Sequence, residues 1–274
     1  MLNRRTSYCL YAILVDRKPY LEEKERKMMY CEADLHTHTI ASGHAYSTVK
    51  ELAEAAQVKG LKMIAITDHG LAMPGGPHEY YFNNLISLPR KIGEVEILRG
   101  VEANIIDAEG HLDVPEHILE KLDIVLAGFH AGTGFDGRSQ EEYTRGALAA
   151  LASPYVHVLV HPGNPDFPLD LEAVAQAAAA NRKALEFNNN SFFYSRPGSL
   201  PRCQHLAQLA KKYKVPIVLS SDAHVFTAVG SFMRAWQVVR GAGITEDQIV
   251  NLTAARVKEF LGWHRRRPRT GRGF

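Results

Sequence analysis

The sequence has little cysteine, almost no excess charge and no long apolar run. The spacing of its three cysteines (Cys9, Cys31 and Cys203) fits neither a disulfide framework nor a paired thiolate zinc site, so we expect a reducing, cytoplasmic setting. Its 274 residues include 32 Lys plus Arg against 30 Asp plus Glu, and a net charge of +2 gives no field that would recruit nucleic acid or an anionic membrane. A small molecule is the default partner.

The longest apolar run, Tyr8–Val15, is only eight residues long, whereas a membrane-spanning helix needs ~20. Arg4 and Arg5 precede this run as in a secretory signal, but Asp16-Arg17-Lys18 follows where a small-residue cleavage site would lie. We therefore expect neither membrane association nor export.

From Met29 onward, short apolar or β-branched runs alternate with polar turns and helical stretches, which is typical of a parallel sheet with crossover helices. At ~150 residues per domain, the length fits one large α/β barrel. Capping-box spacing predicts helix starts at Thr48 with Glu51, Ser139 with Glu142 and Thr245 with Gln248, and Asp170 opens another helix. The seven runs that predict strands are Tyr30–Leu35, Met63–Thr67, Glu96–Val101, Ile124–Phe129, Val156–Val160, Lys183–Phe187 and Pro216–Ser220.

We expect residues 29–262 to form the barrel. Residues 1–28 contain no βα unit, and we interpret them as a disordered, disposable extension or as the product of a start codon placed too far upstream. Residues 263–274 form a basic tail with five arginines, which is more typical of a solvated chain end than of a nucleic-acid contact.

Histidine is concentrated where an α/β barrel places its active site, at or just after strand ends. His36 and His38 are two residues apart, and because strand side chains alternate faces, their imidazoles point the same way. Six of the seven predicted strands end in a ligand-type side chain, which coincidence does not explain. Beyond that pair, these side chains are His44, His69, Glu102, His130, His161, Asp222 and His224.

Seven imidazoles and two carboxylates exceed the needs of one ion, since catalytic zinc takes about three protein ligands. The sequence therefore predicts two or three metal ions. Nitrogen-rich ligation without thiolates suits Zn²⁺, with Mn²⁺ or Fe²⁺ as competitors. Glu102 is the natural bridge between neighbouring ions, because a carboxylate has two oxygens and a neutral imidazole ligates only one ion.

Six motifs follow the predicted strands in order: Asp34-Leu35-His36-Thr37-His38-Thr39, Ile66-Thr67-Asp68-His69-Gly70, Gly100-Val101-Glu102-Ala103-Asn104, Ala127-Gly128-Phe129-His130, His161-Pro162-Gly163-Asn164 and Ser221-Asp222-Ala223-His224. Together they resemble the PHP (polymerase and histidinol phosphatase) family, most closely its bacterial YcdX-type phosphatases. The resemblance runs from about Met29 to Leu261 and implies a distorted TIM-like barrel of seven parallel βα units with three metals. It also implies a homo-oligomer, a trimer.

The same resemblance implies a ligand set for each ion, and all nine positions carry the expected residue type. The first ion would be held by His36, His38, Glu102 and Asp222, the second by Glu102, His130 and His161, and the third by His44, His69 and His224. The resemblance does not extend to residues 1–28 or to the Arg-rich tail.

Lesser candidates surround these ligands. Asp34 and Asp68 either orient the ligands or cap turns. His78, on the loop after the second predicted strand, is a candidate proton donor or a bystander. The loop after the sixth predicted strand is either a plain turn or a substrate-binding loop, with donors and a cation from Asn188, Asn189, Ser191 and Arg196. The other histidines have no converging partner and are expected to be structural or exposed: His111, His117, His157, His205 and His264.

These residues predict a metal-dependent phosphatase that hydrolyses phosphomonoesters with a metal-bridging hydroxide, and Glu102, Asp222 and His224 are its catalytic candidates. The source of the leaving-group proton stays open. One rival is an amidohydrolase-like carbon–nitrogen hydrolase, which commonly uses a carbamylated lysine as a bridge, but no lysine ends a predicted strand here. A PHP-type nuclease and a non-catalytic metal-binding module are further rivals.

Overall fold

The structure is a computed structural model that describes residues 30–193 and 195–266. The predicted extension, residues 1–28, lies outside the described residues, as do residues 267–274 of the predicted basic tail. Residues 263–266, which the sequence assigns to that tail, instead continue the last helix. No helix in the described part of the chain is long and apolar enough to cross a membrane.

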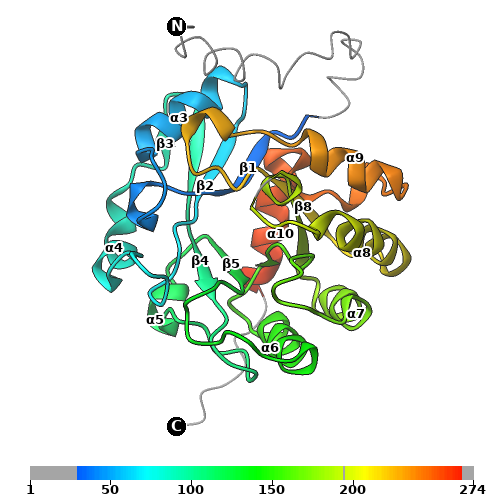
Figure 1. Ribbon diagram of the computed structural model, residues 1–274. Coiled ribbons are helices and arrows are strands. Elements are labelled where there is room, and N and C mark those ends of the chain that lie inside the picture. The colour runs from blue at the N-terminus through cyan, green and yellow to red at the C-terminus, as the bar shows by residue number, and fades with distance from the viewer. Residues whose placement is uncertain (1–29, 194, 267–274) are drawn as a thin grey trace, which may run out of the picture. The chain divides into compact units, whose positions relative to one another are not determined.

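The fold is a nearly closed barrel of seven parallel strands flanked by helices, as predicted (Figure 1). The strand order is β1-β2-β4-β5-β6-β7-β8, and a short strand, β3, pairs antiparallel with β4. The strands are β1 (Ala33–Thr37), β2 (Met63–Ile66), β3 (Lys91–Ile92), β4 (Val95–Asn104), β5 (Ile124–Gly128), β6 (Val158–Leu159), β7 (Ala184–Asn188) and β8 (Ile217–Ser220).

Helices connect the parallel strands, and short 3₁₀ turns lie beside several of them. The α-helices are α3 (Val49–Val58), α4 (Glu79–Asn84), α5 (Glu116–Leu119), α6 (Gln140–Ala152), α7 (Leu171–Asn181), α8 (Ser199–Tyr213), α9 (Met233–Gly241) and α10 (Ala254–Arg266). The 3₁₀ turns are η1 (Ile40–Ser42), η2 (Leu85–Ser87), η3 (Asn190–Phe192), η4 (Phe226–Ala228), η5 (Glu246–Gln248) and η6 (Val250–Leu252).

Three of the four predicted helix caps are confirmed. Thr48 and Ser139 each form a complete capping box, and the Asp170 side chain accepts two backbone N–H groups at the start of α7. The prediction at Thr245 is wrong, because only the 3₁₀ turn η5 follows and Thr245 makes no side-chain cap hydrogen bond. The chain must turn there to bring Ile249 beside β8, where it bridges to Ile217.

The predicted strands are all present, but their bounds shift at functionally important places. β1 begins three residues later than predicted, because the Glu32 N–H donates to Leu252 O in η6 before the strand starts. β4 continues to Asn104, so Glu102 lies inside a strand and pairs with Leu126 of β5 rather than following the strand end. The sequence did not predict β3 at all.

An irregularity in β1 aims the first two histidines into the barrel. Ala33 and Leu35 belong to the apolar core, so strict alternation would point His36 outward. Between Asp34 and Thr37, however, the register with β2 shifts. Asp34 pairs with Ile64 and Thr37 with Ile66, so β1 advances by three residues where β2 advances by two. Such a bulge redirects the following side chains, and His36 therefore faces inward directly after Leu35.

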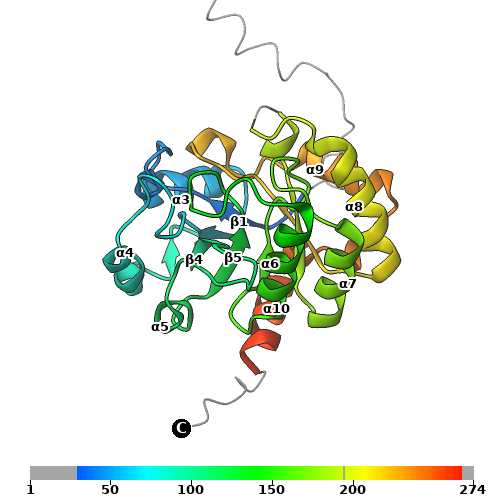
Figure 2. The same cartoon turned by 60° about the horizontal axis from the view of Figure 1, so that its bottom comes forward.

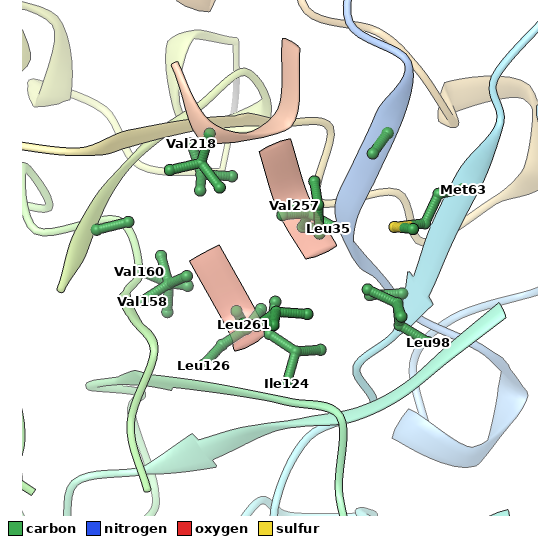
Figure 3. Packing of buried hydrophobic residues seen from close by; sticks show 14 residues of the cluster. Leu35, Met63, Leu98, Ile124, Leu126, Val158, Val160, Val218, Val257 and Leu261 are labelled. Carbon is green, nitrogen blue, oxygen red and sulfur yellow. The ribbon is translucent and has the colours of Figure 1, made fainter. Parts of the chain in front are cut away.

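The apolar core fills the barrel below this level. Residues from every long strand meet Val257 and Leu261 of α10 (Figure 3). In Figure 2, α10 runs beneath the strands, on the side from which their chains enter the barrel. The helix thus closes the amino end with apolar side chains, and polar side chains are left to the carboxyl end.

Asn251 of η6 links the first and last strands of the sheet. Its side chain is fully buried, accepts a hydrogen bond from the Leu219 N–H at 3.0 Å, and donates to the carbonyls of Ala33 and Leu219, each at 2.7 Å. One amide side chain therefore satisfies backbone groups of both β1 and β8, where strand-to-strand pairing is sparse. The isolated bridge between Thr37 and Ala223 and the hydrogen bonds of Ser221 to Asp34 also link the two ends of the sheet.

We predict that Asn251→Ala lowers the free energy of unfolding by about 3 kcal/mol or more, because three buried backbone groups lose their partner at ~1–3 kcal/mol each. A urea titration followed by circular dichroism measures this. Asn181→Ala is the control, since the Asn181 side chain bonds only to Ala177 O of its own helix, and we expect a loss below ~1 kcal/mol. Equal losses in the two variants would contradict a role for Asn251 in closing the barrel.

Candidate metal centre

The side chains predicted as metal ligands converge at the carboxyl ends of the strands. His36 lies in β1 and Glu102 in β4, while the others lie in the segments that follow β1, β2, β5, β6 and β8. The imidazole rings form a connected set, with centroid distances from 4.3 Å, between His38 and His224, to 5.0 Å, between His36 and His38. Residues that are up to 188 positions apart in the sequence therefore share one site.

Glu102 lies at the centre of this cluster and is fully buried. Its Oε1 lies 3.1 Å from His130 Nε2 and 2.8 Å from His161 Nε2. Its Oε2 lies 3.3 Å from Nε2 of His36 and 3.3 Å from Nε2 of His38. Oε2 also lies 2.8 Å from His69 Nδ1. The two carboxylate oxygens therefore face different groups of imidazoles, which is the arrangement that a bridging ligand requires.

On one side of Glu102, four donor atoms have the spacing of a tetrahedral zinc site: His36 Nε2, His38 Nε2, Glu102 Oε2 and Asp222 Oδ1. The two nitrogens are 3.0 Å apart, and Asp222 Oδ1 lies 3.6 Å from His36 Nε2 and 3.3 Å from His38 Nε2. Zinc bonds of ~2.0–2.1 Å to nitrogen and oxygen give a tetrahedron with edges of about 3.3–3.4 Å. These atoms therefore fit a single zinc ion.

Hydrogen bonds at Nδ1 orient the His36 and His38 rings so that each Nε2 points into the cluster. The Nδ1–H of His36 donates to Glu186 Oε1 at 2.6 Å. The Nδ1–H of His38 donates to Ser42 Oγ at 3.0 Å, and the Ser42 hydroxyl donates onward to Asp68 Oδ1 at 2.7 Å. An imidazole held in this way offers its Nε2 lone pair to a metal.

Two further histidines are held in the same tautomer. The Nδ1–H of His130 donates to Asn104 Oδ1 at 2.7 Å, and the Asn104 amide is oriented by its own hydrogen bond to Asp113 Oδ2 at 2.6 Å. The Nδ1–H of His224 donates to the backbone carbonyl of Asp222 at 3.0 Å. Hydrogen bonds at Nδ1 therefore orient four imidazoles with their Nε2 atoms toward the interior of the cluster.

Three buried polar atoms in the cluster make no hydrogen bond within the described residues: His69 Nδ1, Glu102 Oε2 and His130 Nε2. His69 Nδ1 and Glu102 Oε2 are 2.8 Å apart, but they are not aligned for a hydrogen bond. Leaving such groups buried without a partner costs ~1–3 kcal/mol each. A cation bound among them would satisfy all three, so the residues present fit a metal site.

The groups of neighbouring donor atoms in the structure do not coincide with the ligand sets that the resemblance implies. Within the described residues, three groups have ligand atoms lying within 4.8 Å of one another: His36 with His38 and Asp222, His69 with Glu102 and His130, and His38 with His69 and His224. The first group agrees with the implied set for the first ion. His38 and His69 lie between sets, so the implied ion positions are parts of one continuous cluster of donors.

Burial and neighbouring charges set the protonation of the cluster. Burial opposes a charge on His36, yet the carboxylates of Glu102 and Glu186 raise the pKa of His36 well above its usual value. Burial and the proximity of His69 lower the pKa of His38 well below its usual value, and burial and Arg196 lower the pKa of His161 to about 4. Burial would raise the pKa of Glu102, but His36 and other nearby histidines hold it well below its usual value, so the central carboxylate is ionised.

Two of the predicted ligands have a strained backbone. His161, directly after β6, has φ 34°, and Asp222, after β8, has φ 53°. Side chains other than glycine rarely adopt this left-handed region, and such strain is common at functional sites. Gly128 allows the close approach of the His161 ring, because a Cβ at Gly128 would lie 2.9 Å from His161 Cε1.

The predicted substrate-binding residues gather around the second oxygen of Asp222. Arg196 Nη1 donates to Asp222 Oδ2 at 3.0 Å and to Ser191 Oγ at 3.2 Å, and the Asn188 amide donates to the same Oδ2 at 3.1 Å. Asn189 instead accepts the backbone N–H of Arg234 at 2.8 Å, at the start of α9. This loop is therefore tied both to a predicted ligand and to a neighbouring helix.

His78 and the two candidate orienting aspartates make other contacts. His78 Nδ1 accepts the backbone N–H of Tyr80 at 3.2 Å and caps α4, and no contact in the described residues joins it to the cluster. Asp68 acts on His38 through Ser42 and accepts the hydroxyl of Tyr81. Asp34 contacts no imidazole side chain among the described residues and instead holds the β8 loop, where it accepts the backbone N–H groups of Ser221 at 3.2 Å and Gly230 at 2.8 Å.

Sequence reasoning missed the partners of the histidines: Glu186, Ser42, Asn104 and Asp113. A signal existed for Glu186, because it is a charged residue in the middle of a run that we predicted as a buried strand. Ser42 lies in the 3₁₀ turn after β1 and Asp113 in an irregular segment after β4, and nothing in the local sequence pattern predicts their partners.

A PHP-domain family model matches residues 34–190. The chain belongs to the PHP family. Its curated relatives include a probable phosphatase of Thermoanaerobacter sp. (strain X514), 50% identical over 228 residues that cover 83% of this chain and 93% of the relative. A probable phosphatase of Enterobacter sp. (strain 638) is 43% identical over the same shares of the two chains. This PHP-family chain is accordingly a phosphatase, a hydrolase of phosphoric ester bonds.

Solved structures agree on the PHP fold. The histidinol phosphate phosphatase of Lactococcus lactis superposes with a TM-score of 0.54 at 17% identity, covering 78% of this chain and 94% of the other. That protein was solved in complex with zinc, L-histidinol and phosphate. At this level of identity the similarity establishes the barrel fold, and the chemistry of this PHP-family site must be argued from its own residues.

Among the described residues, no lysine lies in this PHP-family site, as an amidohydrolase-like bridge would require. The buried Lys183 directly precedes β7, at the amino end of the barrel, and its Nζ donates to Val156 O at 2.5 Å. Glu102 occupies the position between the two imidazole pairs instead.

We predict that Glu102→Gln lowers both phosphatase activity and metal retention by more than ~100-fold, because it removes a charge that faces imidazoles on both of its sides. Loss of a residue that only hydrogen-bonds to a metal ligand typically costs ~10- to 100-fold. Kinetics and elemental analysis on the same preparation measure both quantities. His117→Ala is the control: its ring is 57% exposed and pairs only with Glu79 at 3.2 Å, and it should change neither quantity. Mild and equal effects of the two substitutions would mean that the site lies elsewhere.

Proposed function

We propose that this phosphatase hydrolyses small phosphomonoesters at a site that holds three zinc ions. The observation that carries the proposal is the near-tetrahedral spacing of four donor atoms, one of them Glu102 Oε2, while the other oxygen of Glu102 faces His130 and His161. Among these, the buried Glu102 Oε2 makes no hydrogen bond within the described residues.

The ligand chemistry supports zinc in particular. The cluster offers seven imidazoles and two carboxylates but no thiolate, a donor set that suits Zn²⁺ and also admits Mn²⁺ or Fe²⁺. The solved histidinol phosphate phosphatase of Lactococcus lactis, which shares the fold, binds zinc and phosphate. We therefore propose zinc as the resident ion.

We assign the ions as the resemblance implies. The first uses His36, His38, Glu102 and Asp222, the second Glu102, His130 and His161, and the third His44, His69 and His224. In support of the third group, the His44 ring stacks on both His69 and His224, with centroids 5.0 Å and 4.9 Å away. The burial of His44 and the charges of these two histidines lower its pKa, which favours the neutral ligand form.

The bound ions would supply a hydroxide at neutral pH, neutralise phosphate oxygens, and align the attacking and leaving groups. The chain's own residues position this chemistry. Glu102 holds the two adjacent ion positions at a fixed separation, and Asp222 links the first ion position to Arg196. All the hydrogen bonds of Arg196 within the described residues leave from Nη1, so its other N–H groups can donate to a phosphate oxygen.

The substrate proposal rests on charge. A phosphomonoester carries nearly two negative charges near neutral pH, and a site with several dications and Arg196 stabilises that charge more than the single charge of a diester. A small phosphorylated molecule is therefore the proposed substrate. Association into trimers stays a prediction of the resemblance.

The metal count is directly testable. We predict about three metal equivalents per chain, because nine ligand side chains converge on one cluster. Elemental analysis of gently purified protein, before and after reloading with Zn²⁺, measures the count, and a chelator-treated sample provides the zero point. One equivalent or fewer after reloading would contradict a three-ion site.

The role of Arg196 separates the candidate reactions. We predict that Arg196→Ala lowers kcat/KM for a phosphomonoester by ~10- to 150-fold and for a diester by less, because a charge-assisted hydrogen bond contributes ~1.5–3 kcal/mol. The measurement is steady-state kinetics with one monoester, one diester and one cyclic amide, at verified metal content.

The control for this experiment is Arg145→Ala, an arginine 57% exposed whose ion pair with Glu109 is 3.8 Å long. It should leave all three rates unchanged. Hydrolysis of the amide alone would refute the phosphomonoesterase proposal, and a clear preference for the diester would move it to the nuclease class.

A further inference from the structure

Among the described parallel strands, β7 is the one that neither contains a proposed metal ligand nor is directly followed by one, yet it carries a carboxylate inside the barrel. Glu186 lies between Ala184, a member of the apolar core, and Asn188, which contacts Asp222. Because strand residues two apart share a face, all three point into the barrel. Glu186 is only 1% exposed.

Each oxygen of Glu186 is bound to a different part of the site. Oε1 accepts the Nδ1–H of His36 at 2.6 Å and also the hydroxyl of Ser220. Oε2 accepts the backbone N–H of His161 at 2.7 Å and the Asn188 amide at 3.2 Å. The carboxylate is therefore fully hydrogen-bonded and connects one proposed ligand of the first ion with one of the second.

We propose that Glu186 is a positioning residue that fixes the separation of the first and second metal positions from the side opposite Glu102. This inference rests on the proposed function. Glu102 faces the ring nitrogens of His36 and His161 that point into the cluster, whereas Glu186 holds their far sides, the His36 Nδ1–H and the His161 main chain. The two carboxylates thus clamp the same pair of histidines.

The backbone of His161 explains why such a clamp is needed. Its φ of 34° is unfavourable for a residue with a side chain, and strain of this kind persists only where surrounding contacts impose it. The hydrogen bond from the His161 N–H to Glu186 is such a contact. Without it, His161 can relax and move its imidazole away from Glu102.

Glutamine at this position has nearly the same shape but cannot replace the carboxylate. Its single oxygen can accept from the His36 side or from the His161 side, and its NH₂ group then faces the donors of the other side. Aspartate keeps the charge but is one methylene shorter, so it cannot reach both sides. The two substitutions therefore separate position from charge.

The test is a Zn²⁺ titration of metal-free protein in competition with a chromophoric chelator, which yields the successive dissociation constants. We expect Glu186→Gln and Glu186→Asp each to weaken two ions by ~10- to 100-fold, the range for an outer partner of a metal ligand, and to leave the third within about threefold of the wild type. Asp113→Asn is the matched control, because Asp113 is a half-buried carboxylate that orients the amide of Asn104, and Asn104 in turn supports His130; it should weaken one ion only.

A spectroscopic measurement reports the separation directly. In the Mn²⁺-loaded wild type, two adjacent ions should give an exchange-coupled electron paramagnetic resonance signal. In the Glu186 variants at equal Mn²⁺ content, this signal should be replaced by that of uncoupled ions. If Glu186→Gln does not fold by circular dichroism, Glu186→Asp carries the test.

The outcomes are distinct. A wild type that binds one ion or none overturns the proposed function and this inference with it. A wild type that binds three ions, together with Glu186 variants that bind all three normally, overturns the role of Glu186 alone. Weaker binding of a single ion also contradicts positioning, because it indicates that Glu186 supports only one histidine. Weaker binding in Glu186→Gln but not in Glu186→Asp contradicts it as well, because it indicates an effect of charge alone.

Discussion

The structure depends on one buried carboxylate surrounded by imidazoles. Glu102 is fully inaccessible, and five histidine nitrogens lie within 3.3 Å of its two oxygens. Burying a carboxylate without compensation costs several kcal/mol, so this arrangement is stable only if positive charge accompanies it. Protonation of His36 supplies part of that charge in the metal-free chain, and bound dications would supply it in full. The hydrogen bonds at Nδ1 of the surrounding histidines then decide where such ions can lie.

Backbone irregularity converts a regular barrel into this site. The bulge in β1 places His36 on the interior directly after the core residue Leu35, and positive φ angles at His161 and Asp222 turn those side chains inward at the ends of β6 and β8. Each departure costs ~1–3 kcal/mol and needs contacts that impose it. Glu186 holds His161 from inside the barrel, and Asp34, which lies between the core residues Ala33 and Leu35, holds the segment that contains Asp222.

The sequence predicted the barrel and the identity of the clustered side chains, because periodicity and motif order are local features. The sequence could not predict the bulge in β1. Leu35 and His36 are an ordinary pair in the sequence, and only the structure shows that both side chains face the barrel interior. Glu102 was expected after a strand and lies within one, because pairing with Leu126 extends β4 beyond its apolar run. Glu186 and Asn251 were missed for a common reason: their partners lie 150 residues away at His36 and 218 residues away at Ala33, and only closure of the barrel brings them together.

The same closure links Arg196, the proposed phosphate-binding residue, to the candidate metal centre. Asp222 presents Oδ1 to His36 and His38 and Oδ2 to Arg196 and Asn188. An ion bound at Oδ1 would hold the carboxylate in this orientation, and the carboxylate in turn fixes the guanidinium. The loop after β7 is held at two points. Asn188 and Arg196 donate to Asp222, and Asn189 accepts the backbone N–H of Arg234 at the start of α9. Asp222 therefore belongs both to the proposed ligand set of the first ion and to the contacts that hold Arg196.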